Sequence, residues 1–171
     1  MAKFTITIKG GDLPGLKKYL KTLAAGAKGG VKVGVLNGAT YSEGPLAGEF
    51  VAQNLARHEF GTEHIPARSP FRSTIAEKQK QWAELAAVYL SRSAGEIGLK
   101  AALTQVGDMM AMDIQAAFET GLLPALKDAT VTLKTKMGYG AHASTPVMLT
   151  GTAQRSITSE YVDHNSTVGG K

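Results

Sequence analysis

The first part of the chain shows a strand-like pattern, then a helix-like pattern, then a second strand-like pattern. Apolar and polar residues alternate over 4–9 (FTITIK), which predicts a strand with one buried face. Leucines then recur at helical spacing over 13–25, after the capping candidate Asp12, and predict an amphipathic helix. A glycine-rich stretch ends this helix, and residues 31–36 (VKVGVL) predict a second strand.

The next part of the chain predicts a loop, a short helix and the start of a long helix. Residues 37–48 are rich in small and turn-forming residues and predict a long loop, and the apolar spacing after Phe50 favours a short helix over a strand. Ser69 is a candidate N-cap, and Pro70 stands where the first helical turn tolerates a missing N–H group. The expected buried face of the long helix consists of Phe71, Ile75, Trp82, Leu85 and Tyr89.

A second long helix is expected after a break near Gly95 and Gly98. Its apolar positions are Leu99, Leu103, Val106, Met110, Ile114 and Ala117. The two long helices are expected to hold most of the core, at roughly 1.5–3 kcal/mol for each fully buried large apolar side chain. Replacing Ile75 or Leu103 by Asp is therefore expected to unfold the domain, because either change would bury an unpaired charge.

The C-terminal part of the chain combines one ambiguous segment with a last strand. Residues 128–136 (DATVTLKTK) are compatible with a strand, by their β-branched content, and with a short helix capped by Asp128. Residues 150–152 predict a turn into one helical turn, and residues 156–162 predict the last strand. Residues 163–171 predict a flexible tail.

Length and composition are typical of a globular protein. The 171 residues suffice for one domain with a core, so a single domain over 1–171 is expected. A hydrophobic fraction of 43% and a charged fraction of 19% are ordinary. No apolar run approaches the roughly 18 residues that span a bilayer, and the N-terminus lacks the apolar core of a signal peptide. The absence of cysteine excludes disulfides and fits a reducing compartment.

The net charge of +5 is concentrated near the N-terminus. Residues 1–32 contain seven lysines and one acidic residue, Asp12. Such a face can meet nucleic acid, an acidic protein or solvent alone. The prevalence of lysine over arginine and the small number of aromatic residues favour a solvated face over specific recognition of nucleic acid.

Candidate chemistry is sparse. His58 and Glu59 stand next to each other as in a zinc-binding helix, but a metalloprotease needs its second histidine four residues after the first. Position 62 is Thr, and His64 lies beyond Gly61, so no metal site is expected. No G-x-S-x-G nucleophile motif occurs, and the glycine-rich stretch 26–34 precedes a strand rather than a helix, which reverses the order of a phosphate-binding loop. The sequence therefore predicts a protein that is not an enzyme.

Three motifs taken together carry the strongest indication of function. They consist of 56–62 (ARHEFGT), then 65–72 (IPARSPFR), and finally 126–134 (LKDATVTLK) with 149–151 (LTG) and 155–158 (RSIT). In this order and spacing they resemble the tail-completion proteins of tailed phages, also called virion-morphogenesis or neck proteins. Ser69 lengthens the family's Arg-Pro junction by one residue, and Ala153 stands where the family prefers Leu.

This resemblance implies a fold and a function. The implied fold is α+β, with a small, mostly antiparallel sheet packed against two long helices and shorter helices. The implied function is structural, without catalysis or a cofactor, in a ring at the head-proximal end of the tail. The ring, a hexamer if it matches the symmetry of the tail, would contact tail-tube, terminator and head-connector proteins in the virion after assembly in the host cytoplasm. It could also contact DNA in the channel, and the alternative function is that of a basic DNA-binding accessory protein.

The same resemblance directs attention to a few positive residues as contacts with partners. Arg68 and Arg72 lie beside an elbow that Gly61 and two prolines restrict, and they are the leading candidates. Pairing with local acids such as Glu63 is the alternative for both arginines. The remaining candidate contacts are Arg57, Lys17 and Lys18.

Overall fold

The computed structural model describes residues 29–36, 38–92, 95–120, 122, 124–148 and 150–163. The strand expected over 4–9, the helix expected over 13–25 and residues 164–171 of the expected tail lie outside these residues. Asp163, the first residue of that expected tail, instead ends the last strand. In chain order the elements are β1 (Gly29–Gly34), η1 (Gly44–Leu46), α2 (Val51–Phe60), α3 (Pro70–Arg92), α4 (Gly95–Ala117), α5 (Asp128–Lys136), η2 (Gly140–His142), α6 (Thr152–Arg155) and β2 (Thr158–Asp163).

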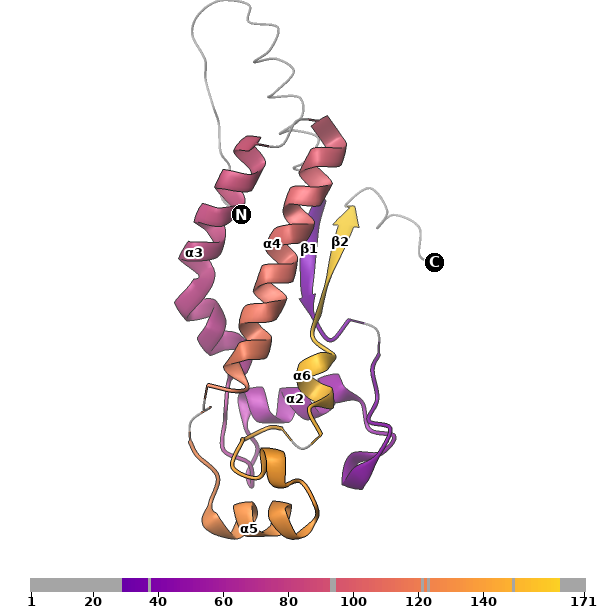
Figure 1. The fold of residues 1–171 in the computed structure, drawn as a ribbon, viewed down its shortest axis with the longest axis vertical. Helices are drawn as coiled ribbons and strands as arrows, with labels where there is room; N and C mark the ends of the chain where they lie inside the picture. The colour runs from indigo at the N-terminus through magenta and orange to yellow at the C-terminus, as the bar shows by residue number, and fades with distance from the viewer. Residues whose placement is uncertain are drawn as a thin grey trace, which may run out of the picture.

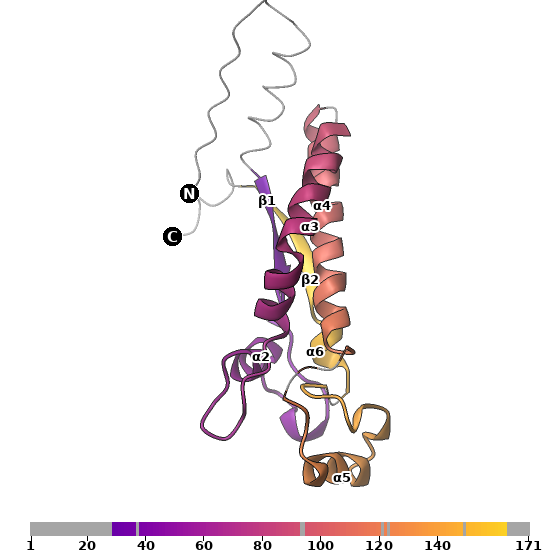
Figure 2. The ribbon, with the colours of Figure 1, turned by 90° about the vertical axis from the view of Figure 1, so that its left-hand side faces the viewer.

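Strands β1 and β2, from opposite ends of the described chain, form an antiparallel two-stranded sheet (Figure 1). Val31 lies opposite Tyr161, and Lys32 lies opposite Glu160. Helix α4 covers one face of this sheet, and α3 packs along α4 (Figures 1 and 2). The close approach depends on Gly107, because a Cβ atom there would lie 3.2 Å from the Cβ atom of Val31. The expected α+β architecture is confirmed.

The core lies where α2, the end of α4 and the start of β2 meet. Val51, Phe118 and Ile157 are fully buried there, and Trp82 of α3 joins the same cluster. The Trp82 indole Nε1–H donates a 2.6 Å hydrogen bond to Asp113 of α4, which ties the two long helices together. Both long helices therefore contribute to the core as expected.

The two long helices follow their expected apolar faces with one exception. In α4, Leu99, Val106 and Ile114 are buried at the expected spacing. In α3, however, Ile75 is 44% exposed, so the expectation that Ile75→Asp would bury a charge is wrong. Thr74, the preceding residue, is buried instead, so α3 turns a different face inward at this point than the apolar spacing predicts.

Two further expectations are decided by the structure. Residues 128–136, which were compatible with strand or helix, form helix α5, with Lys127 at the N-cap and Asp128 in the first turn. The single helical turn expected after Gly151 is α6, and Gly151 has a positive φ of 77° just before it. Residues 124–148, which contain α5 and η2, form a separate layer below α2 in Figure 1.

Candidate assembly interface

The elbow between α2 and α3 is fixed by its backbone. Gly61 has φ 77° and ψ 170°, a region that is essentially restricted to glycine. A Cβ atom at Gly61 would also lie 2.9 Å from the backbone nitrogen of Ala67. Thr62 closes the turn, because its N–H donates to the Ile65 carbonyl at 2.8 Å and its hydroxyl accepts from the Ile65 N–H at 3.0 Å. The chain can therefore reverse here only with glycine at position 61.

The carboxylate of Glu59 joins the end of α2 to the start of α3. Its Oε2 accepts from the Phe71 N–H, and its Oε1 accepts from the Arg72 N–H, both at 3.0 Å. The Arg72 side chain also donates to Oε1 at 3.0 Å. Glu59 is only 6% exposed, so its charge is compensated by the positive end of α3 and by one guanidinium group. A buried acid in α2 thus caps a different helix.

Ser69 does not cap α3 as expected. Its hydroxyl donates to the backbone carbonyl of Glu59 at 2.8 Å and accepts from Arg72 Nη2 at 2.7 Å. The carboxylate of Glu59, twelve residues before Phe71 in the chain, instead accepts the hydrogen bond that an N-cap side chain would accept. Because capping motifs are recognised within a few residues of a helix start, the sequence carries no local sign of this arrangement.

Arg68 is not a surface contact. It is 6% exposed, and its guanidinium donates to the backbone carbonyls of Pro124 at 2.6 Å and Ala125 at 3.3 Å. Burial lowers the pKa of this guanidinium from its ordinary value. The expectation that Arg68 contacts a partner is wrong, and so is the alternative of pairing with Glu63. Arg68 serves to attach the segment that begins at Pro124 to the elbow.

The other candidate arginines have partners within the chain. Arg72 pairs with Glu59 rather than Glu63 and lies over the ring of Phe60, with Cζ 4.9 Å from the ring centroid. Arg57 pairs with Glu49 at 2.8 Å, and both side chains remain partly exposed. An exposed pair of this kind adds little to stability, so Arg57 stays available to a partner. Lys17 and Lys18 lie outside the described residues.

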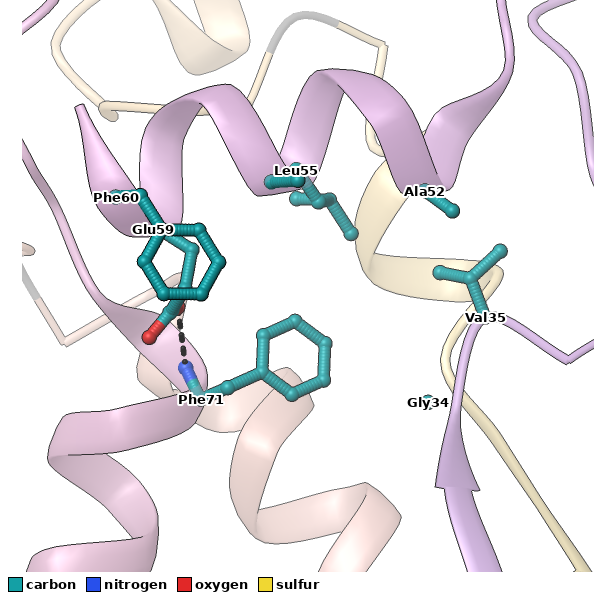
Figure 3. A pocket seen from close by; sticks show the side chains of 8 residues that line it. Gly34, Val35, Ala52, Leu55, Glu59, Phe60 and Phe71 are labelled. Carbon is teal, nitrogen blue, oxygen red and sulfur yellow. Dashed lines mark hydrogen bonds between the residues drawn. The ribbon is translucent and has the colours of Figure 1, made fainter. Parts of the chain in front are cut away.

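Beside the elbow lies an apolar cavity of about 200 Å³ (Figure 3). Its walls come from the end of β1, from α2 and from the first turn of α3, and they include Val35, Ala52, Leu55, Phe60 and Phe71. The Glu59–Phe71 hydrogen bond closes one side of the cavity. Phe60 stands at its edge and is 69% exposed, although Arg72 covers one face of the ring.

A second cavity, of about 380 Å³, lies between α2 and the layer that contains α5. All three motifs meet at this cavity: His58 belongs to the first, Ile65 to the second, and Leu126, Lys134 and Thr150 to the third. The His58 Nδ1 atom is buried and has no hydrogen-bond partner among the described residues. Burial, followed by the charges of Arg68 and Arg57, lowers the pKa of His58. His58 is therefore favoured in its neutral form.

Lys134 holds the far wall of this second cavity. Its Nζ donates to the backbone carbonyls of Thr145 at 2.8 Å and Met148 at 2.7 Å, and also to that of His142. Between these acceptors Val147 has φ 62°, an uncommon conformation for a β-branched residue. Burial lowers the pKa of Lys134. One ammonium group thus organises a loop that has no strand or α-helix of its own.

The described residues contain no group of three or more His, Cys, Asp or Glu side chains placed to hold a metal ion. His58 and Glu59, the adjacent pair considered above as zinc ligands, have different roles. His58 lines the second cavity, and Glu59 caps α3. Among the helices of this part of the chain, none is both long enough and apolar enough to cross a membrane.

Several large apolar side chains remain exposed over the described surface. They are Phe50, Phe60, Ile75, Val88, Met112, Leu133 and Met137. Leu133 and Met137 lie at the second cavity, and Phe60 lies at the first, so three of them border a hollow. Exposed apolar groups beside hollows are typical of surfaces that bind other proteins.

Comparison with known proteins identifies no relative. No protein-family model matches the chain, and neither a curated protein nor a solved structure matches it.

Proposed function

We propose that this chain is a structural protein of the phage neck or tail, which forms a ring at the head-proximal end of the tail and completes the tail or joins it to the head. One observation carries the proposal. The first two motifs that resemble tail-completion proteins follow each other closely, whereas the third begins only at residue 126, yet residues of all three line one cavity. This meeting supports the interpretation of the three motifs as parts of one structural unit.

The internal bonding of the motifs supports a structural role. Glu59 caps α3, Arg68 binds the carbonyls of Pro124 and Ala125, and Lys134 binds three carbonyls of the loop that follows α5. Three charged residues of the motifs are thus used to fix the geometry of the subunit. A subunit of a ring needs such fixed geometry, because small changes in the angle between neighbours prevent closure.

The exposed apolar residues are the proposed contacts within the assembly. Leu133 on α5 and Met137, which directly follows α5, border the second cavity, whereas Phe60 borders the first. Two separated apolar patches suit a head-to-tail ring, in which each subunit offers different surfaces to its two neighbours. The proposed partners are further copies of the chain, most simply in a hexamer, together with tail-tube and head-connector proteins.

The size of the purified protein in solution tests this proposal. Light scattering after size-exclusion chromatography should give a ring-sized species, and negative-stain microscopy should show closed rings. Leu133→Asp and Phe60→Asp should each raise, at least tenfold, the protein concentration that is needed for the oligomer to form. Gln79→Asp, at an exposed position of α3, should leave this concentration unchanged. A wild-type chain that stays monomeric at high concentration and fails to join tails or heads in a reconstitution assay would overturn the proposal.

A further inference from the structure

Phe60 is an aromatic side chain that is held in place although it is not buried. It is 69% exposed, more than any other large apolar side chain of the described surface. The guanidinium of Arg72 lies over one face of its ring, and the ion pair with Glu59 fixes that guanidinium. An aromatic ring that is already ordered loses little conformational entropy on binding, and such rings often supply much of the energy of a protein contact.

The second cavity is a hollow that can enclose an aromatic ring. Its volume of about 380 Å³ lies in the range of sites that enclose a small molecule, and a single ring is smaller than that. Its apolar side chains include Leu46, Ile65, Leu126 and Val147, with the exposed Leu133 and Met137 at the border. The cavity therefore offers mainly apolar contacts to an occupant.

Phe60 and the second cavity lie on different sides of α2. Helix α2 contributes Asn54 and His58 to the second cavity, whereas Leu55 and Phe60 border the first. Phe60 follows His58 by two residues, which corresponds to about 200° of rotation around the helix axis. Phe60 thus points away from the second cavity of its own chain. A protruding group and a hollow on different sides of one subunit can form a head-to-tail contact that repeats from copy to copy.

The charges around the two surfaces are compatible with this contact. Arg72 accompanies the Phe60 ring and stays 55% exposed. Glu43 and Glu63 lie two residues from residues that line the second cavity, and neither has an ion-pair partner among the described residues. Exposed lysines at the two ends of α5 leave the net charge of this border close to zero. The attraction therefore comes mainly from apolar burial, and the charges help to orient the ring.

We propose that Phe60 of one copy inserts into the second cavity of the next copy and packs there against Leu133 and Met137. This inference rests on the proposed function, which requires a repeating contact between copies, and it specifies which surface meets which. The occupant of the cavity is thus a second copy of this chain, and each subunit both provides one ring and receives one.

Complementation between two variants of the full-length chain tests the contact. Phe60→Asp removes the ring but keeps the cavity, and Leu133→Asp alters the cavity border but keeps the ring. At a concentration at which the wild type assembles, each variant alone should be monomeric. An equimolar mixture should form one-to-one dimers that grow no further, because only one intact ring and one intact cavity can meet. Light scattering after size-exclusion chromatography measures the size, and circular dichroism verifies that both variants are folded.

Phe50→Asp is the matched control, because Phe50 is the other exposed phenylalanine of the described surface and lies at the opposite end of α2. It should assemble as the wild type does. A mixture that stays monomeric while the wild type assembles would overturn this inference and leave the proposed function intact. Assembly of Phe60→Asp or Leu133→Asp alone at the wild-type concentration would also overturn it. A monomeric wild type would overturn both.

Photochemical cross-linking locates the ring directly. The photoreactive analogue p-benzoylphenylalanine at position 60 keeps an aromatic ring there, and the partner in the mixture is isotopically labelled wild type. Cross-linked peptides should join position 60 to the labelled peptide that contains Leu133 and Met137. The same analogue at position 50 should not reach that peptide. Cross-links from position 60 only to other parts of the labelled chain would refute the insertion.

Discussion

The Glu59 carboxylate lies 3.0 Å from the backbone nitrogen of Phe71, so the last turn of α2 caps the first turn of α3. Phe71 and Arg72 are two residues whose N–H groups would otherwise lack an acceptor at the start of the helix. The direction of the long helix is thereby set by a side chain on the preceding helix. Since the exposed ring of Phe60 follows Glu59 directly, the same bond also positions a proposed contact surface.

Removing this cap should destabilise the fold. Glu59→Ala is expected to lower the free energy of unfolding by about 1–3 kcal/mol, because two backbone N–H groups and Arg72 lose their acceptor. Glu59→Gln should cost less, since it retains one acceptor oxygen. Urea denaturation followed by circular dichroism measures both. The exposed Glu63→Ala is the control, and an equal loss in Glu63→Ala and Glu59→Ala would contradict the capping role.

Stability should fall below neutral pH through His58. Its pKa in the folded chain is lower than the ordinary value of 6.5, through burial and the neighbouring Arg68 and Arg57. Between the lowered pKa and 6.5 the unfolded chain therefore binds more protons than the folded chain, so acidification favours unfolding. The contribution of one group does not exceed about 1.4 kcal/mol per pH unit.

The difference between wild type and His58→Gln isolates this effect. Urea denaturation at about pH 7.5 and about pH 5.5 should show a smaller loss of stability on acidification in His58→Gln than in wild type. His64→Gln, at an exposed position, should keep the wild-type dependence. If all three proteins lose the same free energy on acidification, then His58 is not the group responsible.

Lys134 should stabilise the loop that follows α5. Lys134→Met removes a charged donor from the carbonyls of His142, Thr145 and Met148, with an expected cost of about 1–3 kcal/mol. Hydrogen exchange should accelerate first in residues 139–148, because this loop has few backbone hydrogen bonds of its own. Lys136→Met, exposed on the same helix, is the control. Unchanged exchange in this loop would refute the role given to Lys134.

Two positions of α4 that are two residues apart should differ strongly in how much stability is lost on substitution by Asp. Ile114 is 2% exposed and belongs to the core, whereas Met112 is 67% exposed. Ile114→Asp is expected to unfold the domain, because it buries an unpaired charge, and Met112→Asp should change stability by less than about 1 kcal/mol. Circular dichroism and thermal denaturation distinguish the two. A folded Ile114→Asp protein would show that the packing around α4 differs from the structure described.

Local sequence patterns determined the regular elements of this protein. The apolar spacing specified both long helices, and the glycines near position 95 marked the break between them. The alternation over 31–36 and 156–162 indicated the two strands within a few residues of their ends. These features follow from the sequence because the periods of helix and strand are properties of the backbone and require no distant partner.

Only the tertiary structure decided which polar groups meet. It brought β1 to β2 across the described chain, selected helix for 128–136, and replaced Ser69 by Glu59 as the cap of α3. It also buried Arg68, because the carbonyls of Pro124 and Ala125 lie within its reach. Whether a charged side chain is buried or exposed depends on acceptors far away in the sequence. No local pattern encodes where the fold places those acceptors.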